Sequence, residues 1–347
     1  MYYFFLLSID EKERETPLKG RKMTSGEGAR FLKRGRKFTN PHRSNTLRKP
    51  WHVLLWKIGY YNDPVPRRPP PEGFIYPTDL PVFQPDLPSC VWINHCTFLI
   101  NADQQSILTD PVWSKYCSPV PIRGLRRKHL PGMPLEDLPN LDLILISHNH
   151  YDHLDEKTVR ALIKDHPQTR WIVPLGLKKW FRRRGIDAHE LGWWDTTGHN
   201  SLQITAVPSQ HFSGRGAFDT NKSLWNGYVV KFTKSGKKLY FCGDTGYNSQ
   251  DFKNIGSKWN QMDLSLIPIG TYSPEKFMKP VHIGPSEAVQ IHKDVASRFS
   301  IGMHWKTFRL SDEPMDLPPY ELYLSMKEAQ LPLESFIALD HGKYVNW

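Results

Sequence analysis

The chain has 347 residues, with 46 Lys and Arg against 35 Asp and Glu, and a formal net charge of +11 at pH 7. Aromatic residues make up 12% of it, with 12 Trp among them, which excludes a disordered chain; the length suits one large domain or two small ones. Its four cysteines show neither a C-x-x-C pair nor a framework spacing, which predicts reduced, buried thiols of an intracellular protein.

The positive charge is concentrated near the start of the chain. Residues 19–49 hold eleven Lys or Arg and one acid, a net +10, which leaves +1 for the other 316 residues. We therefore expect residues 1–50 to form a basic, disordered arm, and this distribution disfavours a nucleic-acid-binding surface over the whole protein. Residues 1–7 are apolar but lack a charged flank, so we expect no signal peptide and no transmembrane helix, and a cytoplasmic or peripheral membrane location.

Residues 51–88 read as a connection between the arm and the main domain. Residues 50–59 have Pro at one end, Gly at the other and dense apolar residues between, which predicts a short helix. Nine prolines among residues 64–88 predict an extended tether.

Residues 89–347 alternate short β patterns with helical ones, which predicts an α/β domain. Helices are expected at residues 155–166, with Asp155 as N-cap, and at 177–184 and 285–297. Strands are expected at residues 91–93, 98–100, 107–109, 143–146, 171–173, 202–207, 228–232, 239–242, 264–267 and 336–339.

The densest group of potential metal ligands follows the apolar strand 143–146. Imidazole and carboxylate together suit zinc or a similar transition metal, and alternate residues of a tight loop can face two adjacent metals. A chance surface cluster is the alternative, but the order of residues is specific. The group is His148-Asn149-His150-Tyr151-Asp152-His153. Further ligands are expected at later strand ends, where His211, Asp244 and His304 stand.

These motifs resemble the metallo-β-lactamase superfamily, and within it the branch that contains N-acyl-phosphatidylethanolamine-hydrolysing phospholipase D and its bacterial relatives. The resemblance runs from about residue 35 to residue 342. It also rests on the segments Val173-Pro174-Leu175-Gly176-Leu177, Val207-Pro208-Ser209-Gln210-His211, Gly243-Asp244-Thr245-Gly246-Tyr247, Ile267-Pro268-Ile269-Gly270 and His304-Trp305-Lys306-Thr307-Phe308.

The resemblance implies an αββα sandwich, with two mixed sheets face to face and helices outside, and two Zn²⁺ per chain. It implies that His148, His150 and His211 hold the first zinc, that Asp152, His153 and His304 hold the second, and that Asp244 bridges them. A shared water or hydroxide would then attack phosphorus, a displacement that two close cations can stabilise.

Three further residues receive roles by resemblance. Asp110 is expected to support the ligand loop, although a simple Asp-Pro turn is the alternative. His95 matches a Gly-His-Ala stretch, with Asn94 in place of the glycine, which leaves the geometry of that turn open. His282 matches a histidine near the substrate head group, where it could donate a proton or bind phosphate, and a structural role is the alternative. Asp152 and His282 are the candidate catalytic residues.

By resemblance the substrate is N-acyl-phosphatidylethanolamine, cleaved to phosphatidic acid and N-acylethanolamine. The alternatives are a hydrolase of a soluble phosphodiester, lactone or other ester, and a nucleic-acid-binding protein or nuclease that uses the arm. A lipid substrate implies an anionic membrane surface as partner, and members of the branch are often dimers. Candidate contacts with membrane or substrate are Trp51, Leu54, Leu55, Trp56, Arg126 and Arg127, unless the helix packs on the catalytic domain.

Overall fold

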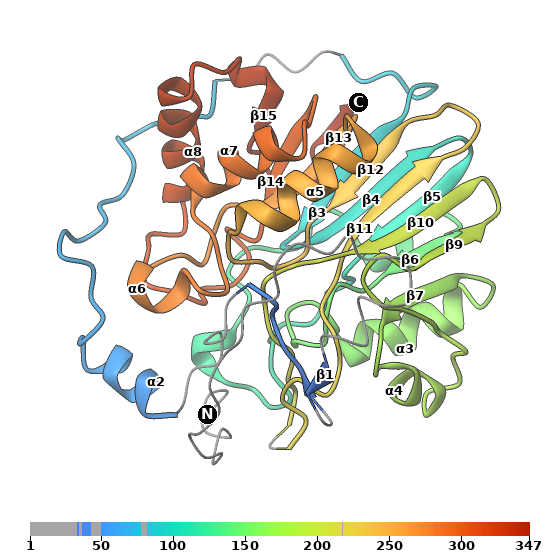
Figure 1. The fold of residues 1–347 in the computed structure, drawn as a ribbon, viewed down its shortest axis with the longest axis horizontal. Coiled ribbons are helices and arrows are strands. Elements are labelled where there is room, and N and C mark those ends of the chain that lie inside the picture. Colours follow the sequence, from blue (N-terminus) through green and yellow to red (C-terminus); the bar gives the residue numbers. More distant parts are fainter. Residues whose placement is uncertain (1–32, 35–36, 43–49, 78–81, 217) are drawn as a thin grey trace.

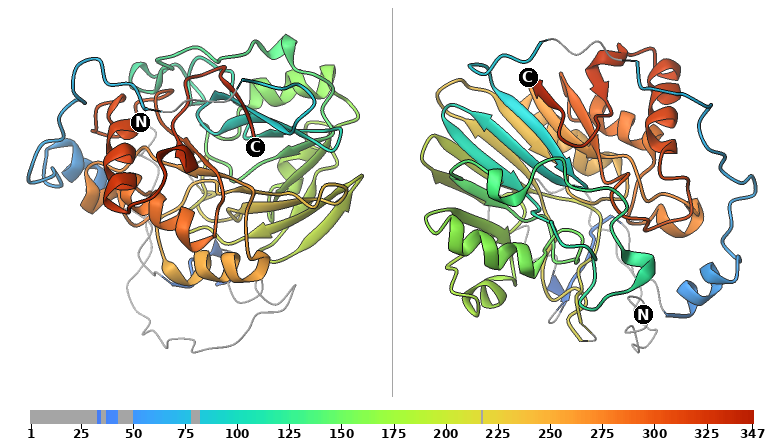
Figure 2. Two further views of the ribbon diagram at one scale, coloured as in Figure 1. Left: turned by 90° about the horizontal axis from the view of Figure 1, so that it is seen from above. Right: turned by 180° about the vertical axis from the view of Figure 1, so that it is seen from behind.

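The computed structural model describes residues 33–34, 37–42, 50–77, 82–216 and 218–347. In these residues the strands form two seven-stranded sheets and one two-stranded hairpin, β1 (Lys33–Arg34) with β2 (Lys37–Phe38). The two large sheets pack face to face, as Figure 1 shows, and helices cover their outer surfaces (Figure 2). This arrangement confirms the expected αββα sandwich.

The two sheets are built on the same plan, because each has an antiparallel half and a parallel half. In order across the first sheet lie β16 (Tyr344–Asn346), β3 (Ser89–Asn94), β4 (Thr97–Ala102), β5 (Gln105–Thr109), β6 (Leu143–Leu145), β7 (Arg170–Pro174) and β8 (His189–Leu191). In order across the second lie β15 (Phe336–Ile337), β14 (Ser300–Met303), β13 (Leu264–Pro268), β12 (Lys238–Phe241), β11 (Gly227–Phe232), β10 (Leu202–Val207) and β9 (Thr196–His199).

All ten expected strands are present, and β14 directly precedes His304, where the sequence placed a strand end. The patterns missed β8, β9, β16 and the hairpin of β1 and β2, which have two to four residues each, with polar or charged residues or glycine among them. A segment of that kind carries too little alternation to be recognised before its partner strand is known.

Helices α3 (Glu156–Asp165) and α4 (Lys178–Arg182) cover the first sheet, and α5 (Ser249–Trp259), α7 (Pro285–Asp294) and α8 (Leu317–Glu328) cover the second. Asp155 caps α3 as expected, since its carboxylate accepts from the Lys157 amide. The shorter elements are α2 (Pro50–Lys57), α6 (Glu275–Met278), η1 (Arg123–Leu125), η2 (Leu135–Asp137) and η3 (Leu333–Ser335).

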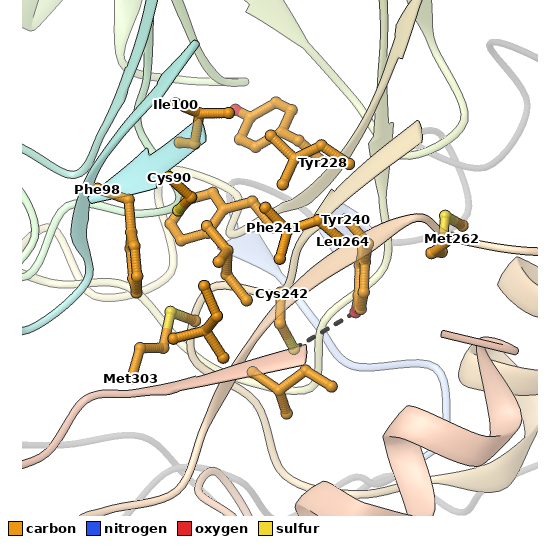
Figure 3. Packing of buried hydrophobic residues seen from close by; sticks show 14 of the residues in the cluster. Cys90, Phe98, Ile100, Tyr228, Tyr240, Phe241, Cys242, Met262, Leu264 and Met303 are labelled. Carbon is orange, nitrogen blue, oxygen red and sulfur yellow. Dashed lines mark hydrogen bonds between the residues drawn. The ribbon is translucent and has the colours of Figure 1, made fainter. Parts of the chain in front are cut away.

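The main core lies between the two sheets and is fully shielded from solvent (Figure 3). Phe98 and Ile100 of β4 face Tyr228 of β11 and Phe241 of β12 across this layer. At roughly 25 cal/mol per Å² of apolar surface buried, such side chains supply most of the free energy that holds the sheets together. All four cysteines are buried and unpaired, as the sequence predicted.

The expectation of a disordered arm over residues 1–50 is wrong for residues 37–42. Phe38 is 4% exposed and packs with Trp193, Leu224 and Trp225, and Asn40 is also buried. Phe38 lies between charged and polar residues in the sequence, so no periodic pattern indicated that its side chain is buried. Most of the predicted arm, residues 1–32, 35–36 and 43–49, lies outside the described residues.

Helix α2 confirms the short helix predicted at residues 50–59, but its two faces have different surroundings. Trp56 is 4% exposed, stacks on Phe277 with ring centroids 5.0 Å apart, and donates a hydrogen bond to Asp312. The prediction that Trp56 contacts a membrane is therefore wrong, and Leu55 is half-buried. Trp51 and Leu54, on the other face, are 52% and 61% exposed.

Within the described ranges, no helix combines the length and the apolar character that crossing a bilayer would require.

Candidate metal centre

The residues predicted as ligands come from both sheets and meet at the carboxyl ends of their strands. His148, His150, Asp152 and His153 lie in the loop that connects β6 to α3. The other three follow β10, β12 and β14, in the order His211, Asp244 and His304. Because parallel neighbours such as β12, β13 and β14 end at one edge, residues distant in sequence come together there.

His148, His150 and His211 form the first donor set. The Nδ1 atom of His150 lies 2.8 Å from Nε2 of His148 and 3.3 Å from Nε2 of His211. Nitrogen ligands 2.0–2.1 Å from a tetrahedral zinc lie about 3.3 Å from one another. The three imidazoles therefore converge closely enough to hold one zinc ion after the 2.8 Å pair separates by about 0.5 Å.

Asp152, His153 and His304 form the second donor set, together with Asp244. Oδ2 of Asp152 lies 3.3 Å from Nε2 of His153 and 3.6 Å from Nε2 of His304. Oδ2 of Asp244 lies 3.3 Å and 3.0 Å from the same two nitrogens. It is also 3.7 Å from Nε2 of His211, so the Asp244 carboxylate stands between the two sets.

Hydrogen bonds on the outer side of the ligands fix which ring nitrogen faces the centre. Nδ1 of His153 donates to Asp110 over 2.7 Å, and Nδ1 of His211 donates to the Val281 carbonyl over 2.8 Å. Nδ1 of His304 lies 3.1 Å from the Thr271 hydroxyl. Each of these rings turns Nε2 inward, which is how partners outside a metal site orient its ligands.

Buried atoms without hydrogen bonds fit the same interpretation. Nε2 of His153, Nε2 of His304 and Oδ1 of Asp244 are shielded from water and make no hydrogen bond. Leaving such atoms unsatisfied is costly unless a metal ion binds them. The donor set of imidazole and carboxylate therefore fits a divalent transition metal such as zinc.

The electrostatics of the cluster favour a bound cation. Burial lowers the pKa of His150 to about 4 and also lowers the pKa of His148 and His211. Burial opposes charge on His304 as well, but Asp244 and Asp152 raise its pKa to about 9.

The carboxylates of Asp152 and Asp244 supply negative charge to the same centre. Burial alone would raise the pKa values of Asp152 and Asp244, but His153 and His304 hold both well below the ordinary value. The carboxylates therefore attract positive charge into the centre, and a metal ion would replace the protons there.

Asp110 and His95 are the two residues predicted to support the ligands. Asp110 is fully buried and accepts hydrogen bonds from the Ser147 amide at 2.7 Å, the Ser147 hydroxyl and the His153 ring. His95 donates from Nε2 to Asp152 over 3.0 Å. The structure thus places each beside one acidic or imidazole ligand of the second set.

The turn at His95 explains how Asn94 is tolerated. The positive φ, 42°, falls on His95, so residue 94 needs no glycine. The Asn94 side chain instead accepts a hydrogen bond from Arg127 over 3.0 Å. Arg127 is 8% exposed and also donates to the carbonyls of Ser114 and Val112. The prediction that Arg127 contacts the membrane or the substrate is therefore wrong. Arg126, in contrast, is exposed.

His282 lies between the donor sets and a cavity of about 330 Å³. Its Nδ1 is 3.8 Å from Oδ2 of Asp244, and its ring centroid is 5.1 Å from that of His211. Burial lowers the pKa of His282 to about 4, so the ring is neutral near pH 7. The other residues that line the cavity include Arg67, Tyr272, Glu275, Lys279 and Glu321.

Several supporting groups escaped the sequence patterns. Ser147 precedes the histidine cluster directly, and this position could have indicated a role. Thr271 and the Val281 carbonyl act on ligands about 30 and 70 residues away in the chain, so only the fold connects them.

Comparisons with known proteins agree with this geometry. A family model described as a β-lactamase superfamily domain matches residues 105–305. The N-acyl-phosphatidylethanolamine-hydrolyzing phospholipase D 1 of Caenorhabditis elegans is 40% identical over 264 residues, which is 73% of this chain and 74% of that protein. The mitochondrial N-acyl-phosphatidylethanolamine-hydrolyzing phospholipase D of Saccharomyces cerevisiae is 40% identical over 60% of this chain and 45% of its own.

Solved structures show the same fold at low identity. Igni18, a metallo hydrolase from Ignicoccus hospitalis, aligns with a TM-score of 0.58 and 21% identity over 75% of this chain and 98% of its own. An isothiocyanate hydrolase from Delia radicum gut bacteria aligns with a TM-score of 0.61 and 17% identity over 75% and 98%.

Proposed function

Because this chain belongs to the β-lactamase superfamily, in the branch of the N-acyl-phosphatidylethanolamine-hydrolysing phospholipases D, we propose that it is a dinuclear zinc phosphodiesterase. Its substrate would be N-acyl-phosphatidylethanolamine and its products phosphatidic acid and N-acylethanolamine. Membership itself carries the coarser description, a metal-dependent hydrolase of the metallo-β-lactamase fold.

The observation that carries the proposal is the meeting of two donor sets at Asp244 beside the cavity. We assign His148, His150 and His211 to the first zinc and Asp152, His153 and His304 to the second, with Asp244 between them. Two zinc ions held in this way would supply a nucleophile at neutral pH and would stabilise charge on phosphate oxygens.

The chain's own side chains would orient the phosphodiester. Neutral His282 keeps one ring N–H on the wall of the cavity, where it can donate a hydrogen bond to a phosphate oxygen. Arg67 and Lys279 bring positive charge to the same cavity, although Glu321 and Glu275 pair with them at 2.7 Å. The phosphate-binding role of His282 needs only this placement, whereas the proton-donating role would also require a protonated ring, which the lowered pKa disfavours near pH 7.

Helix α2 would bring the cavity to the membrane. Val53 and Trp56 pack on Phe277 and Met278 of α6, and Glu275 at the start of α6 lines the cavity. The opposite face exposes Trp51 and Leu54, and Ile58 and Tyr60 after it are 70% and 66% exposed. Aromatic and aliphatic residues of this kind insert at the bilayer interface, and nearby Lys and Arg attract anionic lipid.

The test is an assay of zinc-loaded protein on a panel of substrates. We expect two zinc ions per chain and release of N-acylethanolamine from N-acyl-phosphatidylethanolamine in mixed micelles. Soluble phosphodiesters, lactones and other esters form the comparison set. No turnover of the lipid combined with fast turnover of a soluble ester would contradict the proposed substrate and leave the zinc assignment standing.

The nucleic-acid alternative has a separate signature. If the basic residues contact phosphates of DNA or RNA, the logarithm of the affinity for an oligonucleotide should fall steeply and linearly with the logarithm of salt concentration.

The predicted homodimer is tested by sedimentation of the same preparation.

A further inference from the structure

Residues 37–42 pass directly behind the first donor set. Asn40 is 8% exposed, and its Nδ2 atom donates a hydrogen bond to the backbone carbonyl of His211 over 2.7 Å. Its Oδ1 atom accepts from Nε1 of Trp225 over 3.1 Å. The two polar groups of one amide thus connect a distant segment, 171 residues away, to the loop that presents a ligand.

The segment is anchored on both sides of Asn40. On one side the Phe38 amide donates to the Asn221 carbonyl over 2.8 Å, and the Phe38 ring is buried beside Trp225. On the other side Nε2 of His42 lies 3.2 Å from Asp251 at the start of α5. We call residues 37–42 the strap.

His211 is held at two points by two separate parts of the chain. Its ring donates to the Val281 carbonyl over 2.8 Å, which sets the direction of Nε2, and its backbone carbonyl is held by Asn40. His211 itself is fully buried. A shift of its backbone would therefore move Nε2 relative to His150, 3.3 Å away.

We propose that Asn40 is a positioning residue for the metal centre, which acts through its hydrogen bond to the His211 carbonyl. This inference rests on the proposed assignment of His211 as a zinc ligand. Partners outside the ligand set usually contribute about 10- to 100-fold to metal affinity, because they hold each ligand in its bound orientation. Asn40 would supply this kind of support from a segment that the sequence predicted to be part of a disordered arm.

Two substitutions separate the His211 contact from mere packing. Asn40→Ala removes both hydrogen bonds. Asn40→Asp keeps the size of the side chain and an acceptor for Trp225, but it places a carboxylate oxygen against the His211 carbonyl oxygen, where Nδ2 donates in the native chain. If Asn40 positions His211, both variants should lose about 10- to 100-fold in affinity for one of the two zinc ions.

The measurement is zinc affinity by chelator competition on folded protein, with the absorption spectrum of the cobalt-substituted protein as a second readout. Phe38→Leu and His42→Ala are the matched controls, because each weakens another anchor of the strap and leaves the hydrogen bond between Asn40 and the His211 carbonyl intact. We expect these controls to change the melting temperature and to leave zinc affinity within about threefold of the native value, well below the 10-fold loss expected of a ligand-positioning contact.

The possible failures are distinguishable. Native protein that binds fewer than two zinc ions would contradict the metal assignment, and with it this inference. Native protein that binds two ions, with Asn40→Asp unchanged in zinc affinity and in cobalt spectrum, would overturn the role of Asn40 alone. Equal losses of zinc affinity in Asn40→Asp and in both controls would show that the strap only stabilises the fold. That result would also overturn the role of Asn40.

Discussion

Asp244 is the side chain on which both donor sets depend. Its Oδ2 atom lies within 3.7 Å of His153, His304 and His211, and its Oδ1 atom is buried without a hydrogen bond. If each set holds a cation, as we propose, this one carboxylate would offset part of the repulsion between them. No other residue of the centre touches both sets in this way among the contacts of the described chain.

We expect Asp244→Asn to lose most of the bound zinc and at least 100-fold in activity, because the amide keeps the shape and removes the negative charge. Metal content by mass spectrometry and turnover on the preferred substrate measure the two effects. Asp187→Asn, an exposed carboxylate with a side chain 85% exposed, is the control. Retention of two zinc ions in Asp244→Asn would falsify the ligand assignment.

The His42–Asp251 pair gives the strap a pH-dependent anchor. The hydrogen bond to Asp251 raises the pKa of His42 above 6.5 despite partial burial. A raised folded-state pKa contributes stability that is present below the unfolded value and is lost as pH rises through the folded value.

The melting temperature of the native protein should therefore exceed that of His42→Ala by more at about pH 5.5, below the unfolded pKa, than at about pH 9, above it. Thermal unfolding at constant ionic strength measures the difference. A gap that is independent of pH would show that the ring contributes only packing.

At the scale of elements, α2 combines one anchored face with one exposed face. Trp56 fixes the helix to α6 through Phe277, and Trp51 and Leu54 point away from that contact. Exposed Trp and Leu side chains such as these are of the kind that insert at a bilayer interface. The contact of α2 with α6, whose Glu275 lines the cavity, supports the proposal that membrane docking and substrate access are coupled.

We expect Trp51→Ser with Leu54→Ser to reduce sedimentation with anionic liposomes severalfold and to leave the melting temperature nearly unchanged, since both side chains are exposed. Trp56→Ala should behave in the opposite way and lower the stability of the packed helix by about 3 kcal/mol. Liposome sedimentation and thermal unfolding of the two variants test the division of roles. Unchanged liposome binding by the double variant would show that the exposed face of α2 does not bind the membrane.

At the scale of the whole molecule, charge and catalysis occupy different regions. Residues 19–49 carry a net +10 of the total +11, whereas the proposed ligands lie between residues 148 and 304. The strap changes how this region can be tested, because deleting residues 1–49 would remove Asn40 and its contact with His211.

Replacing Arg36, Arg43, Arg48 and Lys49 with Gln removes four positive charges and leaves Phe38 and Asn40 unchanged in the sequence. At about 1 kcal/mol per basic residue at a membrane surface, binding to anionic liposomes should fall strongly at low salt and little at high salt. Zinc content and turnover of a micellar substrate without anionic lipid should stay the same. Equal liposome binding by the variant and the native protein at low salt would show that these four basic residues do not contribute to membrane binding.

The order of the proposed ligands along the chain could be predicted because each of them follows an apolar strand. The alternation of His148, His150, Asp152 and His153 in one loop is specific enough to predict metal binding before any fold is known. Patterns of this kind record local chemistry, so they also predicted the buried strands and the N-cap of α3 correctly.

The sequence by itself therefore determined the fold class, the family resemblance and the candidate ligands. Only the tertiary structure decided which neighbours act on them. Asn40 reaches His211 across 171 residues, Trp56 turns inward to Phe277, and Arg127 is buried beside Asn94. The physical reason is that burial and hydrogen-bond partners are properties of packed surfaces, and a residue surrounded by polar or charged neighbours in sequence gives no sign of the surface that will cover it.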